Sequence, residues 1–318
     1  MPAQEDFVAQ AAPFRAELIA HCYRMLGSVH DAEDLVQETY LRGWRGYHAF
    51  EERASLRTWL YRIATTACLR ALENRARRVL PAGVVDGSTD PDIDLDERSG
   101  PHTWLEPIPD ALMANTPEDD VTAKLSLRLA VMTAMQELPA RQRAVLILRD
   151  VVQFSAAEVA ELLETTPAAV NSSLQRARSR LAELSPSEDD VAEPQDARRR
   201  ELLDRYCAAF ENSDMAGLAA LLQADVKLEM PPLPVWFTGQ EAVMRFLAGR
   251  AFTKAGDVAM IATAANAQPA VAEYRRDGDQ VMRAHSIHVL TTGASGIAGI
   301  TVFLDPGLFS AFGFPSTR

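Results

Sequence analysis

The chain has 318 residues, which suggests two or three domains, and its hydrophobic (47%) and aromatic (7%) fractions are those of an ordinary globular protein. No run of about 18 apolar residues is present and the acidic N-terminus lacks an apolar signal core, so we expect neither a membrane span nor export. The three cysteines, Cys22, Cys68 and Cys207, lie far apart. They favour a reducing cytosol over a disulfide framework, and no Cys/His cluster has the spacing of a metal site.

The net charge of −12 argues at first against nucleic acid, but the charges are unevenly distributed. Residues 86–120 carry eleven acids and one base, a net of −10, whereas residues 53–78 carry seven arginines and one glutamate, a net of +6. Phosphates respond to local charge, so the arginine-rich segment is a candidate nucleic-acid surface.

Breaks in composition divide the chain into two all-helical modules followed by one α+β domain. Residues 7–80 form the first helical module, and residues 81–122 are rich in Pro, Gly, Asp and Ser and read as an acidic linker with a candidate docking island at 104–107. Residues 123–184 form the second helical module. A short linker over 185–195 precedes a domain at 196–318 that begins with two helices and continues with alternating strands.

The segment 31–44 of the first module is predicted to be an amphipathic helix with Asp31 as its N-cap. Its apolar face comprises Ala32, Leu35, Val36, Tyr40 and Trp44. The opposite face is either a solvated surface or a docking surface for a partner helix, and it carries Asp34, Gln37, Glu38, Arg42 and Arg45.

A second helix is predicted from about residue 55 to 78, with an apolar stripe on one side and arginines mainly off that stripe. Arginines along one helix offer bidentate contacts to phosphates. Trp59 and Tyr61 are aromatic candidates for stacking on an unpaired base, although Trp59 shares the apolar stripe and so also fits the core. Short polar residues in the loop 50–55 suit a pocket for a flipped base.

The second module reads as a helix-turn-helix. Pro139 suits the first turn of a helix, residues 155–158 form a capping box, and Thr166 followed by Pro167 predicts the start of the last helix. That last helix turns Val170, Leu174, Ala177 and Leu181 inward. Its polar outer face suits the major groove of DNA, and the candidate base-reading residues are Ala168, Asn171, Ser172, Gln175 and Arg176.

Both helical modules resemble those of an extracytoplasmic-function (ECF) RNA polymerase sigma factor. The resemblance is carried by three stretches, 31–44 (DAEDLVQETYLRGW), 55–72 (SLRTWLYRIATTACLRAL) and 138–181 (LPARQRAVLILRDVVQFSAAEVAELLETTPAAVNSSLQRARSRL). It implies that the first module is sigma region two and the second is sigma region four. It also implies three partners: the polymerase core, through the β′ clamp helices and the β flap; promoter DNA; and an anti-sigma protein.

The same resemblance assigns roles to individual residues. The polymerase-binding residues would be Asp31, Asp34, Leu35, Gln37, Glu38 and Arg42. The −10 DNA contacts would be Arg53, Ser55, Arg57, Trp59, Arg62, Thr65, Thr66 and Arg70, and the outer face of the last helix would read the −35 element. Many relatives carry Lys or Arg at the positions of Asn171 and Ser173, so the −35 contacts are expected to be less electrostatic here. Many also carry Asn at the position of Thr66, a departure that affects a −10 contact.

Residues 196–318 resemble the SnoaL-like domain, of the nuclear-transport-factor-2-like (NTF2-like) fold, that is fused to one subgroup of these sigma factors. The matching stretches are 202–222, 228–246 and 265–274, and residues 269–276, 280–292 and 296–304 read as strands. The implied fold is a cone-shaped α+β domain in which a curved sheet and helices enclose an apolar pocket. Candidate lining residues are Trp236, Phe237, Tyr274, His285 and His288. The two histidines cannot both face inward from one regular strand, because side chains alternate.

We expect the C-terminal domain to regulate the activity of the helical modules. No Asp–His pair on facing strands is evident, so we expect no catalytic residue, and we expect no cofactor. A small ligand in its pocket is a candidate partner. The domain follows region four closely enough either to occlude the DNA-binding surfaces or to brace the two modules. Two other functions stay open: a helix-turn-helix regulator with a ligand-sensing domain, and a SnoaL-like enzyme with helical appendages. Neither gives a purpose to the helix at 31–44 or to the arginine-rich helix.

Overall fold

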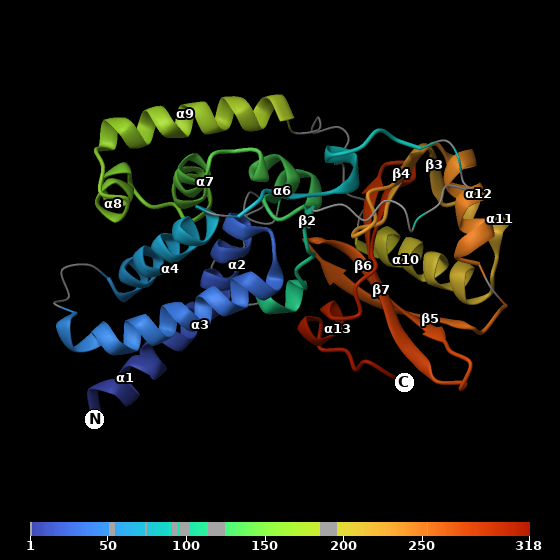
Figure 1. Ribbon diagram of the computed structural model, residues 1–318, viewed down its shortest axis with the longest axis horizontal. Helices are drawn as coiled ribbons and strands as arrows, with labels where there is room; N and C mark the ends of the chain where they lie inside the picture. Colours follow the sequence, from blue (N-terminus) through green and yellow to red (C-terminus); the bar gives the residue numbers. More distant parts are fainter. Residues whose placement is uncertain are drawn as a thin grey trace. The chain divides into compact units, whose positions relative to one another are not determined.

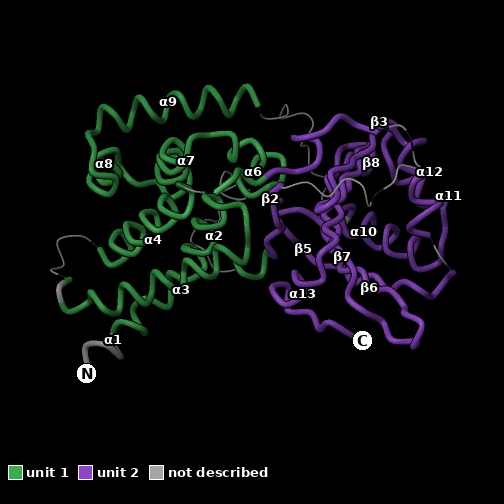
Figure 2. Tube along the Cα trace, viewed as in Figure 1, with its two compact units in different colours: residues 1–78, 110–185 green, residues 79–109, 186–318 purple. Residues whose placement is uncertain are grey.

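A computed structural model describes residues 2–50, 55–73, 75–88, 90, 95, 102–113, 125–184, 196–252 and 254–318. The chain divides into two compact units (Figure 2). The first unit comprises residues 1–78 and 110–185, and the second comprises residues 79–109 and 186–318. Both helical modules therefore belong to one unit. No helix among the described residues is long and apolar enough to cross a membrane.

The described residues of the first half of unit 1 are mostly helical (Figure 1). Its elements are α1 (Pro2–Ala11), η1 (Ala12–Phe14), α2 (Arg15–Leu26), α3 (Val29–Gly46), η2 (Tyr47–Ala49) and α4 (Leu56–Leu72). Helix α2 is almost entirely buried and packs against α3 and α4. It ends at Gly27, whose φ of 71° lies in the left-handed region that glycine adopts without strain.

Helix α3 is capped by Ser28, whose hydroxyl accepts a hydrogen bond from the Asp31 amide at 3.1 Å. The prediction that Asp31 is the N-cap was wrong, because the helix begins two residues earlier and Asp31 occupies its first turn. The assignment of Trp44 to the buried face was also wrong, since this side chain is 40% exposed.

The second half of unit 1 contains the predicted helix-turn-helix. Its elements are η5 (Asp110–Met113), α6 (Leu129–Gln136), α7 (Ala140–Leu146), the π-helical turn η6 (Ile147–Val151), α8 (Ala156–Leu162) and α9 (Pro167–Leu184). The capping box at Ser155 and Glu158 is confirmed. Thr166 caps α9 by accepting a hydrogen bond from the Ala169 amide at 3.2 Å, also as predicted.

A buried arginine joins the two halves of unit 1. Arg143 on α7 donates to the backbone carbonyls of Met25, Gln136 and Leu138 and to the side chain of Gln136. Burial lowers the pKa of Arg143 to about 10, which leaves it charged at neutral pH. Four acceptors thus compensate for the removal of this cation from water.

Unit 2 is built on a six-stranded sheet in the order β4-β3-β8-β7-β6-β5. The strands are β3 (Leu222–Glu229), β4 (Trp236–Thr238), β5 (Val258–Ala265), β6 (Gln268–Arg276), β7 (Met282–Gly293) and β8 (Gly296–Phe303). Strands β3 and β8 run parallel, and the other neighbours run antiparallel. The helices are α10 (Asp196–Glu211), α11 (Met215–Ala219), α12 (Gln240–Arg250) and α13 (Leu308–Ala311).

Helix α10 packs on β5 and β6, and α12 packs on β3 and β4 (Figure 1). The core between them and the sheet includes the rings of Tyr206, Phe210, Phe237 and Phe246. This arrangement is the curved sheet with packed helices that the sequence predicted for the C-terminal domain.

Part of the segment expected to be a linker belongs to unit 2. Residues 79–109, which we call the strap, include β1 (Arg78–Val79, beginning one residue earlier), η3 (Pro81–Gly83) and β2 (Thr103–Trp104). Leu105 and Ile108 are buried, at 1% and 0% exposure. These apolar side chains lie in and beside the expected docking island 104–107. Their burial contributes apolar contacts to a segment that is otherwise mostly polar. Most of its acidic residues lie outside the described part of the chain.

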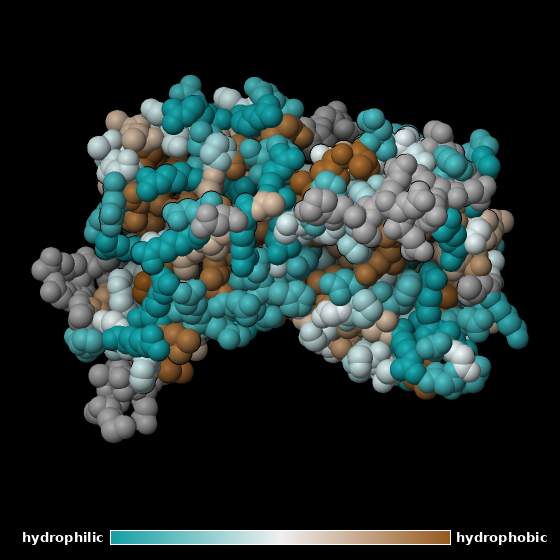
Figure 3. Space-filling model, in the orientation of Figure 1, coloured by the Kyte–Doolittle hydropathy of each residue, from teal (hydrophilic) through white to brown (hydrophobic). Residues whose placement is uncertain are grey.

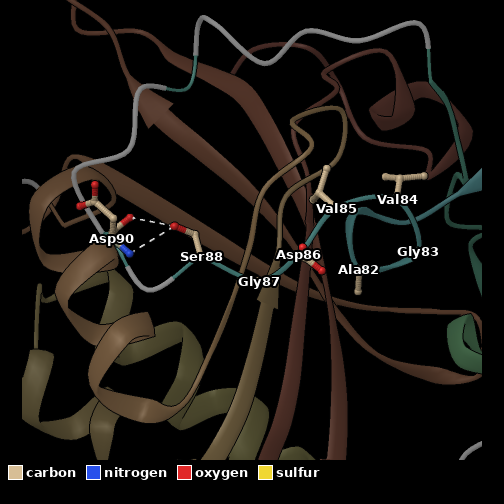
Figure 4. Close-up of a pocket in the computed structure, with 8 residues that line it drawn as sticks. All are labelled: Ala82, Gly83, Val84, Val85, Asp86, Gly87, Ser88 and Asp90. Atoms are coloured by element: carbon tan, nitrogen blue, oxygen red, sulfur yellow. Dashed lines mark hydrogen bonds between the residues drawn. The ribbon is translucent and has the colours of Figure 1, made fainter.

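The strap is hydrogen-bonded to the body of unit 2 at both ends. At one end the backbone carbonyl of Trp236 accepts a hydrogen bond from the Ser88 amide at 2.8 Å. The indole Nε1 of the same residue donates to the Val85 carbonyl at 2.9 Å. At the other end Asn266 and Ile108 exchange two hydrogen bonds, each of 3.0 Å. Figure 4 shows residues 82–88 running alongside the strands of unit 2.

Candidate functional site

The outer face of α3 presents most of the residues predicted to bind polymerase. Asp34 and Gln37 are exposed, Leu35 is half-buried, and Glu38 forms an ion pair with Arg42 one turn later. This pair keeps both side chains on the surface stripe, where a partner helix can reach them.

Asp31 differs from the other residues of this face because it is tied to the far end of the arginine-rich segment. It accepts from Arg75 at 2.5 Å and from Arg78 at 2.8 Å. Burial raises its pKa, but the hydrogen bonds from the two arginines outweigh burial and hold the pKa of Asp31 below its ordinary value. Asp31 therefore anchors residues 75–78 to α3.

Two apolar side chains extend the outer face of α3. Leu41 is 57% exposed and Trp44 is 40% exposed, and they follow Asp34 and Gln37 at helical spacing. Figure 3 shows hydrophobic surface near α1 and α3. The face therefore joins acidic and apolar groups, a combination typical of a protein-binding surface with a polar rim. The sequence-based prediction left out Leu41, although it lies on the same helix face as Asp34 and Gln37.

Helix α4 carries the described residues predicted for −10 contact, and Arg53 lies outside the described residues. Ser55 caps the helix by accepting from the Thr58 amide at 3.1 Å. Arg57 is bound to Glu17 at 2.7 Å, and its guanidinium lies over the rings of Tyr61 and Phe154. Trp59 is half-buried against Phe50, with ring centroids 5.0 Å apart.

Further along α4 the predicted residues alternate between surface and core. Arg62 and Arg70 are exposed, and Arg62 lies 3.4 Å from Glu164 of the helix-turn-helix. Thr66 is half-buried and its hydroxyl donates back to the Arg62 carbonyl. Thr65 is fully buried and hydrogen-bonded to His21 at 2.9 Å, so its side chain does not face the surface. Tyr61, a stacking candidate, is also fully buried.

Helix α9 brings all five predicted −35 residues to the surface. Val170, Leu174 and Ala177 are buried against α7 and α8, as the periodicity predicted. The residues that share the exposed face are Ala168, Asn171, Ser172, Gln175 and Arg176. A bidentate ion pair from Arg178 to Asp150, at 2.6 and 2.8 Å, holds the middle of α9 on η6. The face predicted to read the −35 element is therefore exposed on a helix held in place by the rest of unit 1.

Unit 2 encloses a pocket of about 180 Å³ between the sheet, α10 and α12. His285 and His288 both line it, whereas Trp236, Phe237 and Tyr274 do not. Trp236 holds the strap, Phe237 stacks on Phe246 in the core, and the Tyr274 hydroxyl donates to the Pro315 carbonyl.

A β-bulge explains how both histidines reach the pocket. Opposite β6, Glu273 pairs with Ser286 but Tyr274 pairs with Ala284, so His285 is an extra residue on β7. The alternation that forbids two inward histidines applies to a regular strand, and this strand is irregular at that point.

A buried polar network forms one end of the pocket. Glu273, 1% exposed, accepts from Arg275 Nε at 2.8 Å and from the Ser286 hydroxyl, and it lies 3.1 Å from His288 Nε2. The Tyr206 hydroxyl lies 2.8 Å from His288 Nδ1. Burial opposes ionisation of Glu273, but its bond to His288 and the nearby cations hold its pKa well below the ordinary value.

Sequence reasoning missed Glu273, Arg275 and Tyr206 as pocket residues. The search was for an Asp–His pair, whereas the chain places a Glu and a His on neighbouring strands. The available signal was Glu273 itself, the only acidic residue in the apolar strand 268–276, because a carboxylate within a buried strand needs partners.

Family models match three parts of the chain. "Sigma-70 region 2" matches residues 12–78, "Sigma-70, region 4" matches residues 128–181, and "SnoaL-like domain" matches residues 203–303.

Individual proteins give the same result. The ECF RNA polymerase sigma factor SigG of Mycobacterium tuberculosis is 47% identical over 325 residues, which cover 99% of this chain and 86% of that relative. The ECF RNA polymerase sigma factor SigJ of the same species is 29% identical over 76% of this chain and 72% of its own length. The crystal structure of SigJ shares the fold, with a TM-score of 0.63 and 23% identity, and covers 97% of this chain and 99% of that one.

Proposed function

The chain belongs to the ECF RNA polymerase sigma factors, and from this premise we propose which of its surfaces recognise polymerase and promoter. As an alternative sigma factor it directs bacterial RNA polymerase to specific promoters. We assign residues 7–80 to region two, residues 123–184 to region four and residues 196–318, together with the strap, to a regulatory part. Its place of action is the cytoplasm, where the polymerase is.

The outer face of α3 is proposed to bind the β′ clamp helices, through Asp34, Gln37 and Glu38 with Leu41 and Trp44 beside them. The observation that supports this assignment is the continuous exposure of acidic and apolar groups along one face of a helix whose other side is core. Leu35 and Arg42 flank this stripe, and Asp31 contributes by fixing the segment of Arg75 and Arg78.

A charge-reversal experiment tests this surface. Asp34→Lys combined with Glu38→Lys should abolish co-purification with core polymerase. The matched control reverses two exposed acids of α10, Glu201→Lys with Asp204→Lys, and should bind normally. Normal binding by the α3 double variant, with an unchanged melting temperature, would contradict the assignment.

Promoter DNA is proposed to contact α4 and the loop before it at the −10 element and α9 at the −35 element. The exposed residues Ser55, Arg62 and Arg70 are available on α4, and the five exposed residues of α9 are available as they stand. Arg57 is engaged by Glu17 and by Phe154 of region four. We infer that this unit is a closed conformation and that −10 binding requires region four to move away from α4.

The C-terminal domain is proposed to act as a brace by holding the strap, the segment that connects regions two and four. Fixing both ends of a connector reduces the conformational freedom of the two modules it joins, which lowers the entropic cost of binding two promoter elements at once. A chain cut at residue 184 would remove Asn266 and Trp236, the hydrogen-bond partners of the strap. Point variants at the strap therefore test this role more cleanly than truncation.

The same domain is proposed to be non-catalytic. Both ring nitrogens of His288 are engaged by protein groups: Nδ1 by Tyr206, and Nε2 by Glu273 and Ser286. A general base needs a free nitrogen within hydrogen-bond reach of a substrate proton. His288 therefore fits a structural role in the pocket wall, and a search for turnover of carbonyl or hydroxyl substrates by the full chain should find none.

A further inference from the structure

The pocket of unit 2 has a strongly asymmetric wall. Eleven of its seventeen lining residues are aliphatic, aromatic or thioether side chains without a charge or hydrogen-bonding group. The remaining six include Arg250, Glu273, Arg275 and the two histidines, which come from the end of α12 and from β6 and β7. A molecule that fills this space must therefore have an apolar body and one polar end.

The charges at the polar end favour an anion. Arg250 and Arg275 each carry a positive charge and Glu273 a negative one, while burial lowers the pKa of His285 and keeps it neutral at neutral pH. The lining thus carries two guanidinium groups and one carboxylate. That carboxylate, Glu273, already has Arg275, Ser286 and His288 as partners within the wall.

Arg275 has donors to spare. It gives Nε to Glu273 at 2.8 Å, and its two terminal NH₂ groups make no hydrogen bond to the described residues. The guanidinium is thereby fixed in orientation by the buried carboxylate, and Arg275 is one of the residues that line the pocket. A carboxylate matches the paired donors of a guanidinium in planar, charge-assisted geometry. His285, which makes no hydrogen bond to the part of the chain that the structure describes, adds a ring nitrogen nearby.

The volume limits the body of the ligand. An enclosed apolar cavity of roughly 150 Å³ accommodates benzene, and this pocket measures about 180 Å³. One aromatic ring or a short alkyl chain fits, whereas a steroid-sized molecule does not. We propose that the pocket binds a small amphiphilic monocarboxylate, with its acid on Arg275 and its apolar body among Phe210, Leu228 and Phe246.

The pocket also touches the strap. Leu95 of the strap is one of its lining residues. A ligand in the pocket therefore contacts the segment that connects regions two and four. An effect of the ligand on transcription through this contact rests on the proposed bracing function, whereas binding of the ligand does not. Ligand occupancy changes the packing of Leu95 and so the hold of the domain on the strap.

Calorimetric titration of the full chain tests the site with two carboxylates, phenylacetate and hexanoate, and with 2-phenylethanol as the neutral counterpart of phenylacetate. Both acids should bind saturably, and phenylacetate should bind at least about tenfold more tightly than the alcohol. No saturable binding of either acid at millimolar concentrations would overturn the proposal.

Three variants locate the binding. Ala251→Met fills the pocket and should weaken phenylacetate at least about tenfold, whereas Ala248→Met, on the exposed side of the same helix end, should bind like the wild type. Arg275→Gln should abolish the preference for the acid over the alcohol, and Arg275→Lys, which keeps the charge beside Glu273, should retain part of it. Melting temperatures identify any variant that fails to fold.

Unchanged affinity in Ala251→Met, or an unchanged acid preference in Arg275→Gln, would overturn the assignment. Hydrogen exchange of the strap with and without phenylacetate measures the coupling separately. Binding without a change in strap exchange would refute the coupling while leaving both the site and the bracing role intact. Absence of binding in a chain whose strap variants still alter transcription would refute the site alone.

Discussion

The strongest test of the bracing role is removal of the Trp236 side chain. Its ring covers Gly87, where an added Cβ would lie 3.0 Å from Cζ2, and its Nε1 donates to the Val85 carbonyl at 2.9 Å. Complete truncation of a buried Trp costs about 3–5 kcal/mol, and because this ring is only half-buried we expect about 2 kcal/mol for Trp236→Ala. Trp236→Phe keeps a ring but loses the hydrogen bond, which costs about 1 kcal/mol.

Hydrogen exchange at single amides reports these costs. The Ser88 amide donates to the Trp236 backbone carbonyl, a bond that both variants keep, so its exchange measures local opening of the strap. It should exchange roughly 30-fold faster in Trp236→Ala and about fivefold faster in Trp236→Phe. Promoter-specific run-off transcription should fall in the same order.

The distal end of the strap provides the internal control. The Ile108 amide donates to Asn266 and should keep its wild-type exchange rate in both variants. Equal acceleration at Ser88 and Ile108 would mean that unit 2 as a whole is destabilised. Unchanged exchange at Ser88, or faster exchange without loss of transcription, would refute the reasoning about the brace.

Three further outcomes are expected. Arg176→Ala should weaken binding to the −35 element by about 1–3 kcal/mol and relax sequence preference if Arg176 touches a base edge. An unchanged footprint over the −35 element, with unchanged −35-dependent initiation, would place α9 elsewhere. Phe154→Ala removes the ring that contacts Arg57 and Tyr61, so it should open the closed unit. In a fluorescence titration, its affinity for −10 single-stranded DNA should be several-fold higher than that of the control Val8→Ala, which changes a solvent-facing residue. Unchanged affinity would argue against a closed resting state. Burial lowers the pKa of His21 from 6.5 to about 3, so the unfolded chain takes up the proton first and unit 1 should lose stability as pH falls through that interval. Denaturant titrations of His21→Gln should show a shallower pH dependence, and an equal slope in both proteins would exclude His21 as its source.

Periodicity and capping residues predicted most of the fold. The inward positions Val170, Leu174 and Ala177 of α9 follow directly from helical spacing, and the capping box at Ser155 marks where α8 begins. The strands predicted at 269–276, 280–292 and 296–304 correspond to β6, β7 and β8 within two residues.

The remainder depends on contacts between segments far apart in the chain. Nothing local to Ile108 indicates that it exchanges two hydrogen bonds with Asn266, more than a hundred residues later. Thr65 looks like a surface residue by its chemistry, but its partner His21 lies on another helix. The pocket network joins Tyr206 of α10 to His288 of β7, which lie 82 residues apart. It also requires the bulge at His285 in the pairing of β6 with β7, and the register of a strand pair is not encoded in either strand alone.

Transcription initiation in vitro tests whether this chain selects promoters. Bacterial core RNA polymerase, genomic DNA of the host and this chain are combined, and the 5′ ends of the transcripts are sequenced. We expect discrete start sites that share two short upstream elements, absent with core enzyme alone and absent with the Asp34→Lys, Glu38→Lys variant. Start sites identical to those of core enzyme alone would show that this chain does not direct initiation.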